Sequence, residues 1–244
     1  TDGATAVIEN TLDESGEYIL SFDGTGSNYI HSLSIINMTE PAYTQNGNWY
    51  AVKAGDGKNL ITTLELVSGY NAAANAPRAY IFLPNGTYDL GETVLTTISG
   101  NNISLIGESM DKTIIVNKPE VEGIGATATI LNTGKNLYIQ DLTLQNAYDY
   151  YNAKDAGHAV CLQDRGTQTI CKKVKMLSYQ DTYYSNDPQG KGQYYFEDSE
   201  IHGTVDYICG GGDAYFNRVL LVNESRSASG KSGDDVIAAP NSKS

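Results

Sequence analysis

The stretch that decides the fold is YQDTYY, residues 179–184, together with GTVDYI, residues 203–208. Each segment places one carboxylate among apolar and aromatic neighbours, and the two acids, Asp181 and Asp206, are 206 − 181 = 25 residues apart. That spacing is about one coil of a solenoid, whose repeats run to roughly 20–45 residues. Equivalent positions on successive coils lie one strand spacing apart, so we expect the two carboxyl groups side by side, about 5 Å apart.

A pair of acids at that distance has a chemical consequence. Both groups cannot ionise freely, so the pKa of one of them rises. One carboxyl group can then hold a proton while the other attacks or stabilises charge. A lone Asp more often caps a turn, but the setting of this pair favours a catalytic interpretation.

Short β-type segments follow one another through most of the chain, for example over 159–162 and 214–222. Asn, Gly, Asp and Lys separate them, with no long helix between them. Polar residues open successive segments, namely Asn136, Gln168, Gln193 and Asp213. Their uneven spacing, which shortens along the chain, is typical of coils with insertions in their turns, and the scarcity of hairpin dipeptides disfavours a sandwich. The pattern predicts an all-β chain wound as a right-handed parallel β-helix.

The chain divides near residue 48. Residues 1–48 contain short β-type runs of their own and end in a polar stretch, so we expect a strand-rich N-terminal segment or the tail of a preceding module. Residues 49–244 form the solenoid domain, with one amphipathic helix predicted over 60–68. Because the chain stops just after a predicted strand without a capping helix, we expect further coils beyond residue 244.

Composition limits the partners. A net charge of −13 argues against nucleic acid and other polyanions and suits a neutral polymer. The three cysteines, Cys161, Cys171 and Cys209, show no metal-binding spacing, so a zinc site is not expected. No apolar run approaches the ~20 residues of a membrane span. We expect a monomer that does not insert into membranes.

Four segments occur in one order: GTY at 86–88, HAVCL at 158–162, YQDTYY at 179–184 and GTVDYICG at 203–210. In this order they resemble the patterns GTY, QAVAL, YQDTLY and GTVDFIFG of the pectin methylesterases, carbohydrate esterases with a right-handed β-helix fold. The resemblance covers roughly residues 50–240. It implies a secreted or periplasmic pectinesterase that hydrolyses methyl-esterified homogalacturonan to carboxylate and methanol without a cofactor.

The resemblance also implies roles for individual residues. Asp206 matches the nucleophile, Asp181 the general acid and base, and Gln180 an amide that stabilises the oxyanion. Tyr184 and Tyr207 match aromatic residues that line the sugar groove. Neighbours in a regular strand face opposite sides, so Gln180 and Asp181 share a cleft only if the backbone bends between them.

Two departures from the family pattern stand out. His158 occupies the position of a glutamine; it is either a hydrogen-bond donor to the oxyanion, which adds pH dependence, or a buried structural imidazole. The family's LGRPW segment is absent, and Arg226, which follows the nucleophile by close to one coil, is the candidate to face the cleft. We therefore expect the chain as given to be catalytically impaired. Tyr150 is either a sugar platform or part of a solvated loop.

Three alternatives remain at this point. Carboxyl groups about 5 Å apart also suit a retaining glycoside hydrolase acting on a pectic polysaccharide. A calcium-dependent lyase needs a cluster of acids that the sequence lacks. A non-catalytic, polysaccharide-binding solenoid would use the same fold without turnover.

Overall fold

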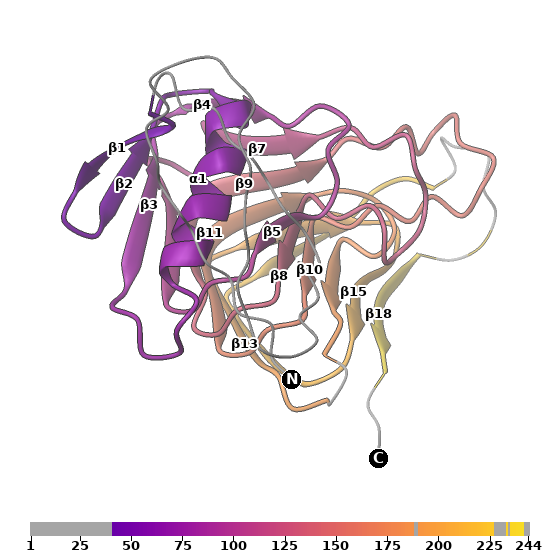
Figure 1. Ribbon diagram of the computed structural model, residues 1–244. Helices are drawn as coiled ribbons and strands as arrows, with labels where there is room; N and C mark the ends of the chain where they lie inside the picture. Colours follow the sequence, from indigo (N-terminus) through magenta and orange to yellow (C-terminus); the bar gives the residue numbers. More distant parts are fainter. Residues whose placement is uncertain (1–40, 188–189, 227–232, 234, 242–244) are drawn as a thin grey trace, which may run out of the picture.

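The structure is a computed structural model that describes residues 41–187, 190–226, 233 and 235–241. The β-type runs predicted within residues 1–40 lie outside the described residues. Within them, the strands form two sheets wound around one core (Figure 1), and neighbouring strands are parallel except for the first pair. The chain thus adopts the predicted parallel β-helix.

The larger sheet contains β1 (Tyr43–Asn46), β2 (Trp49–Val52), β3 (Ala79–Leu83), β4 (Gly86–Asp89), β6 (Ile103–Gly107), β7 (Thr113–Asn117), β9 (Tyr138–Asn146), β11 (Thr169–Leu177), β13 (Gln193–Glu197), β14 (Glu200–Gly203), β16 (Asp213–Asn217) and β17 (Leu220–Asn223). The smaller sheet contains β5 (Thr96–Ile98), β8 (Ile130–Asn132), β10 (Leu162–Asp164), β12 (Tyr183–Ser185), β15 (Val205–Gly210) and β18 (Val236–Pro240).

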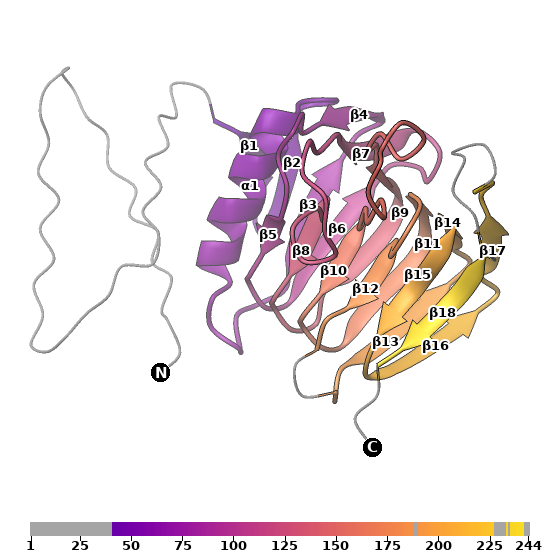
Figure 2. The same cartoon turned by 90° about the vertical axis from the view of Figure 1, so that its right-hand side faces the viewer.

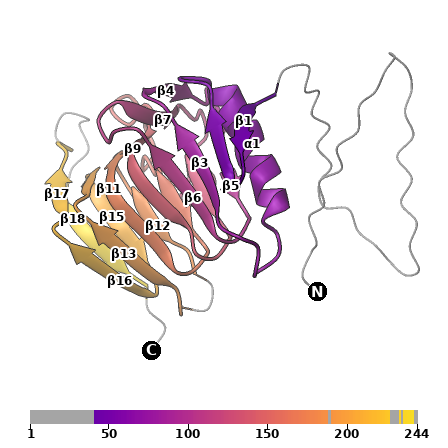
Figure 3. The ribbon, with the colours of Figure 1, turned by 90° about the vertical axis from the view of Figure 1, so that its left-hand side faces the viewer.

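The larger sheet bends into two arms. Its two longest strands, β9 and β11, each contain one residue in the left-handed region, Asp141 (φ 54°) and Lys173 (φ 52°). The first halves of these strands pair with β6 and β13, and the second halves with β7 and β14. A coil therefore passes through the first arm (Figure 3), the second arm and the smaller sheet (Figure 2), as in β6, β7 and β8.

The pairing register confirms the predicted repeat. Gln193 pairs directly with Asp213, so these two predicted segment starts are equivalent positions on adjacent coils. Thr169, which follows Gln168, pairs with Tyr194, which follows Gln193. The polar residues that open the segments therefore mark the winding of the coils.

Apolar side chains stack in columns inside the coils. One column runs through Ile81, Leu105, Ile139, Cys171 and Phe196, which pair in register and are all at most 1% exposed. Removing such side chains from water is the main favourable contribution to folding. The columns fix which residues face inward, and so which are left for the outer faces.

One helix of the described residues, α1 (Gly57–Tyr70), packs against β2, β3, β4 and β5 at the first coil (Figure 1). The side chain of Asp56 caps it by accepting a hydrogen bond from the N–H of Asn59 at 2.9 Å. Leu60, Leu64 and Val67 are fully buried, as their helical spacing predicted. The helix is longer than the predicted 60–68. No helix among the described residues is long and apolar enough to cross a membrane.

Some predicted boundaries were wrong. One strand was expected over 214–222, but Arg218 has a φ of 54° and separates β16 from β17. A strand expected over 159–162 begins only at Leu162. β1 lies before the predicted boundary at residue 48 and pairs with β2. The division into an N-terminal segment over residues 1–48 and a solenoid domain over residues 49–244 stays a proposal.

Candidate active site

The two acids of the sequence motifs lie on adjacent coils. Tyr183 pairs with Ile208, 208 − 183 = 25 residues on, which is also the interval between Asp181 and Asp206. The N–H of Asp181 donates to the carbonyl of Val205 at 3.1 Å, directly beside Asp206. The winding of the chain therefore brings these two carboxylates to equivalent positions, as their spacing predicted.

The backbone bends at both acids. Asp181 has a φ of 61° and Asp206 a φ of 51°, in the left-handed region that residues other than glycine rarely adopt. The pairing between β15 and β18 is irregular between Val205 and Ile208. The bend required for Gln180 and Asp181 to share a cleft is thus present.

Gly203, which opens the second motif, permits a close approach there. A Cβ atom at this position would lie 2.2 Å from the Cβ of Tyr207 and 2.6 Å from the carbonyl oxygen of Tyr179. Any larger residue would push the two motif segments apart.

Asp181 is the more buried of the two acids. It is 3% exposed, and its Oδ2 atom accepts no hydrogen bond from the described residues. Burial raises the pKa of Asp181 to about 6; His158 and the Cys209 thiol lower that pKa, while the charges of Asp206 and Glu122 raise it. Asp181 therefore holds its proton at mildly acidic pH. Its neighbour Asp206 is less buried, because its side chain is partly exposed to solvent.

His158 lies directly beside the acid pair. It forms a parallel bridge with Gln180 on the next coil, and its Nε2 atom is 3.5 Å from Oδ2 of Asp181. The bridge places His158 one coil before Gln180 and Asp181. The ring is partly exposed, so it is not the fully buried structural imidazole of the alternative interpretation.

Glu122 holds the imidazole in place. Its Oε1 atom contacts Nδ1 of His158 and also accepts a hydrogen bond from the His158 N–H at 3.1 Å. With Nδ1 facing the carboxylate of Glu122, Nε2 is left facing that of Asp181. Glu122 was missed in the sequence, because it lies in a loop without a motif and far along the chain from its partner.

The predicted residues Gln180 and Tyr184 lie close to the acids. Both are partly exposed. Tyr184 is on β12, where it pairs in register with Gln163 on one side and Cys209 on the other. The charge of Asp181 contributes to raising the pKa of Tyr184, although burial is the larger cause.

The structure contradicts two predicted sugar contacts. Tyr207 is fully buried, and its hydroxyl donates to Oδ1 of Asn223 at 2.8 Å. The left-handed Asp206 and the irregular register beside it break the usual alternation and turn Tyr207 into the core. Tyr150 is 1% exposed and lies against Tyr179, with ring centroids 4.6 Å apart and planes 5° apart. Neither ring has a free face for a polymer.

Arg226 follows the end of β17. It is partly buried and lies next to Gly233, where a Cβ atom would come within 2.9 Å of Nη1. Its role toward a substrate stays a prediction. The described residues contain no group of three His, Cys, Asp or Glu side chains suited to a metal ion.

The sequence pattern of the pectinesterase family matches residues 50–242 of this chain. The chain therefore belongs to the pectinesterase family. Among curated relatives, pectinesterase 2.1 of Solanum lycopersicum is 30% identical over 70% of this chain. A putative pectinesterase/pectinesterase inhibitor 38 of Arabidopsis thaliana is 28% identical over 84% of it. The chain spans only 30% of the length of the tomato protein and 40% of the Arabidopsis protein.

Solved structures agree with this assignment. A pectin methylesterase crystallised with a hexasaccharide superposes with a TM-score of 0.61 at 30% identity, over 72% of this chain and 56% of that chain. A pectin methylesterase from Yersinia enterocolitica gives a TM-score of 0.60 at 28% identity, over 72% of this chain and 59% of that one.

Proposed function

We propose that the protein is a pectin methylesterase, which hydrolyses the methyl esters of galacturonan to carboxylate and methanol. The observation that carries the proposal is the pairing of Asp181, whose pKa is raised to about 6, with Asp206 on the next coil. A protonated acid beside a second carboxyl group supplies a proton donor and a nucleophile in one place. Membership of the pectinesterase family supports the choice of substrate.

In the first step, the Asp206 carboxylate attacks the carbonyl carbon of the methyl ester. The negative charge that develops on the carbonyl oxygen is stabilised by the side-chain amide of Gln180, a donor type worth roughly 10²–10³ in rate. As the tetrahedral intermediate collapses, Asp181 gives its proton to the leaving oxygen and methanol departs. The galacturonate acyl group is then held on Asp206 as an anhydride.

In the second step, Asp181, now a carboxylate, takes a proton from water as the water attacks the acyl carbon. Collapse of this intermediate releases the galacturonic acid group, which loses its proton to solvent to give the carboxylate. The Asp206 carboxylate is regenerated, and Asp181 is again protonated. His158 and Glu122 hold the position of Asp181 and tune its proton affinity throughout. We infer that Tyr184, which is partly exposed on β12, contacts the sugar.

The wider setting follows from the same proposal. A methyl-esterified polymer is neutral and compatible with a chain of net charge −13, whereas the carboxylate product is repelled. We place the enzyme outside the cytoplasm, secreted or periplasmic, where such a polymer is encountered. The proposed catalytic cycle involves no cofactor and a single copy of the chain.

The test is release of methanol from methyl-esterified galacturonan by the parent chain and by Asp206→Asn. Glu65→Gln, an exposed carboxylate on α1, is the matched control for removal of one negative charge. Because the LGRPW segment is absent, we expect slow but measurable methanol release from the parent and from the control, and essentially none from Asp206→Asn. New reducing ends without methanol would show a glycoside hydrolase instead. Full activity in Asp206→Asn would show that Asp206 is not the nucleophile.

A further inference from the structure

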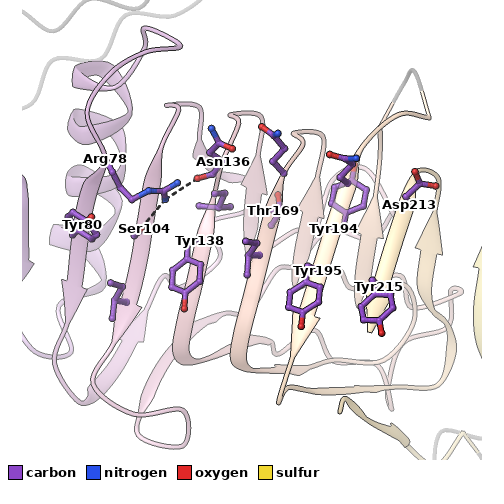
Figure 4. A pocket seen from close by; sticks show the side chains of 15 residues that line it. Arg78, Tyr80, Ser104, Asn136, Tyr138, Thr169, Tyr194, Tyr195, Asp213 and Tyr215 are labelled. Atoms are coloured by element: carbon purple, nitrogen blue, oxygen red, sulfur yellow. Dashed lines mark hydrogen bonds between the residues drawn. The ribbon is translucent and has the colours of Figure 1, made fainter. Parts of the chain in front are cut away.

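A groove of about 720 Å³ runs across the outer face of the first arm, over β3, β6, β9, β11, β13 and β16 (Figure 4). This face belongs to the larger sheet, whereas Asp181 and Asp206 belong to the turns and strands of the smaller one. The groove is therefore not part of the candidate active site.

The floor of the groove is a row of side chains in pairing register. Tyr138 pairs with Ile170, Ile170 with Tyr195, and Tyr195 with Tyr215, on four successive coils. Tyr215 is 64% exposed and Ile170 is 39% exposed. Side chains in register repeat at the strand spacing of about 4.8 Å, so Tyr138 and Tyr195, two strands apart, are separated by about 10 Å.

The rings are held in a fixed orientation. Tyr195 and Tyr215 are nearly parallel, with planes 3° apart and centroids separated by 5.7 Å. The Tyr195 hydroxyl accepts a hydrogen bond from Nδ2 of Asn217 at 3.0 Å, and the Tyr138 hydroxyl donates to Oε1 of Gln140. In Figure 4 the rings of Tyr195 and Tyr215 lie side by side, and Tyr138 lies two strands from Tyr195 in the same row, with all three faces toward the viewer.

Amide side chains form one edge of the groove. Asn136, Gln168 and Gln193 line it, two residues before Tyr138, Ile170 and Tyr195 on their respective coils. Each amide offers both donors and an acceptor. A row of such groups beside aromatic faces suits a ligand that carries hydroxyl groups along its edge and apolar C–H groups on its face.

The groove carries little charge. Among the described residues that line it, only Arg78 and Asp213 are charged, one of each sign, in a chain of net charge −13. Nη1 of Arg78 already donates to the carbonyl of Ile103 at 3.3 Å, to Oγ of Ser104 at 3.0 Å and to the carbonyl of Asn136 at 3.2 Å. An anionic ligand therefore finds no excess of positive charge here, and a neutral one is favoured.

We propose that this groove binds an uncharged, flat polysaccharide, a chain of equatorially linked pyranoses such as a β-1,4-glucan, laid across the strands. Equatorial links keep successive sugar rings in one plane, which matches tyrosine rings that face the same way. The separation of about 10 Å between Tyr138 and Tyr195 places these two rings under sugars two units apart, and Tyr215, one strand further on, lies under the next sugar. Axially linked galacturonan bends at each linkage and does not lie flat on such a row. The inference does not depend on the proposed esterase activity.

The experiment is calorimetric titration of the 244-residue chain with cellohexaose. We expect binding that is not displaced by an excess of methyl-esterified galacturonan. Tyr195→Ala and Tyr215→Ala should each weaken the Kd about tenfold, the scale of one aromatic contact. Tyr215→Phe should keep the parent affinity, because stacking needs the ring and not the hydroxyl. Tyr184→Ala, an aromatic truncation on the smaller sheet, should leave cellohexaose binding unchanged.

Tyr215 is largely exposed, so its substitution should not prevent folding, and an unchanged Tm of Tyr215→Ala checks this. Absence of cellohexaose binding by the folded parent overturns the proposal. So does binding that methyl-esterified galacturonan displaces and that Tyr184→Ala abolishes, because it then occurs at the esterase site. A dimer in sedimentation that Tyr215→Ala dissociates would assign the face to a second copy of the chain instead.

Discussion

The outer faces of the two sheets are built from the same coils but carry different chemistry. Beside the smaller sheet, Asp181 is buried next to His158 and Asp206, and its proton affinity is strongly altered. On the first arm of the larger sheet, Tyr195 and Tyr215 pair in register, and the residues that line the groove around them carry little charge. The first face groups ionisable side chains. The second face repeats uncharged side chains from coil to coil.

The difference lies in the backbone. The tyrosine row keeps one residue per coil in regular register, so equivalent side chains simply repeat. At the acid pair, the pairing between β15 and β18 is irregular between Val205 and Ile208, and unlike side chains meet there. A regular ladder suits recognition of a repeating polymer, whereas a strained, irregular turn suits a single reaction centre.

The largest effect is expected at the nucleophile. Asp206→Asn should lower kcat for methanol release by at least about 10³-fold, because the covalent route is lost. Cellohexaose affinity should be unchanged, since the groove lies on the other sheet. Parallel assays of the two functions on one preparation check the comparison, and a joint loss of both would contradict the separation of the faces.

The next effect is on stability. The pKa of Asp181 is raised from 3.8 to about 6, so the folded state binds this proton more tightly than the unfolded chain does. Its contribution to stability is complete below about pH 4 and is lost as the pH rises through 6. Asp181→Asn removes the buried charge and should stabilise the protein at pH 8 by on the order of 2 kcal/mol, with no gain at pH 3.5.

Asp164 provides the matched control for that change. It is fully buried in the core, where burial raises its pKa to about 6 as well. Asp164→Asn should give a similar gain in Tm at pH 8 while methanol release persists, whereas Asp181→Asn loses activity. Lower stability of Asp181→Asn than of the parent at pH 8 would show that its charge is better accommodated than burial suggests.

A smaller effect is expected at His158, because glutamine also donates a hydrogen bond. His158→Gln should change kcat by less than about tenfold. The imidazole lowers the pKa of Asp181, so its removal should raise that pKa. The proton donor must be protonated, and the alkaline limb of the kcat/KM profile should therefore move to higher pH. An alkaline limb that stays in place or moves to lower pH would contradict the contact between His158 and Asp181.

The smallest effect is expected at Tyr207, where a substitution tests whether the ring belongs to the core or contacts the substrate. Tyr207→Phe deletes one hydrogen bond to Asn223 and should cost about 1 kcal/mol in urea unfolding. Because the ring is fully buried, KM for methyl-esterified galacturonan should not change. A raised KM with unaltered stability would show that Tyr207 contacts the galacturonan instead.

The winding of the coils could be predicted from the sequence because polar residues such as Gln193 and Asp213 fall at the strand starts that set the register. The acid pair was predicted from one interval for the same reason. Short strands such as β5 and β12 were missed, because so few residues show no periodicity. The burial of Tyr150 and the contact from Glu122 depend on how loops fold back, which local patterns do not encode.

The central claim is that Asp181 and Asp206 act on each other across adjacent coils. The direct test is a ¹³C NMR titration of the Asp carboxyl carbons, with the Asp181 signal assigned by its absence in Asp181→Asn. We predict that this carboxyl titrates near pH 6 in the parent and at lower pH in Asp206→Asn, where the neighbouring charge is gone. Titration near pH 4 in both proteins, or the same elevated pKa in both, would contradict the pairing.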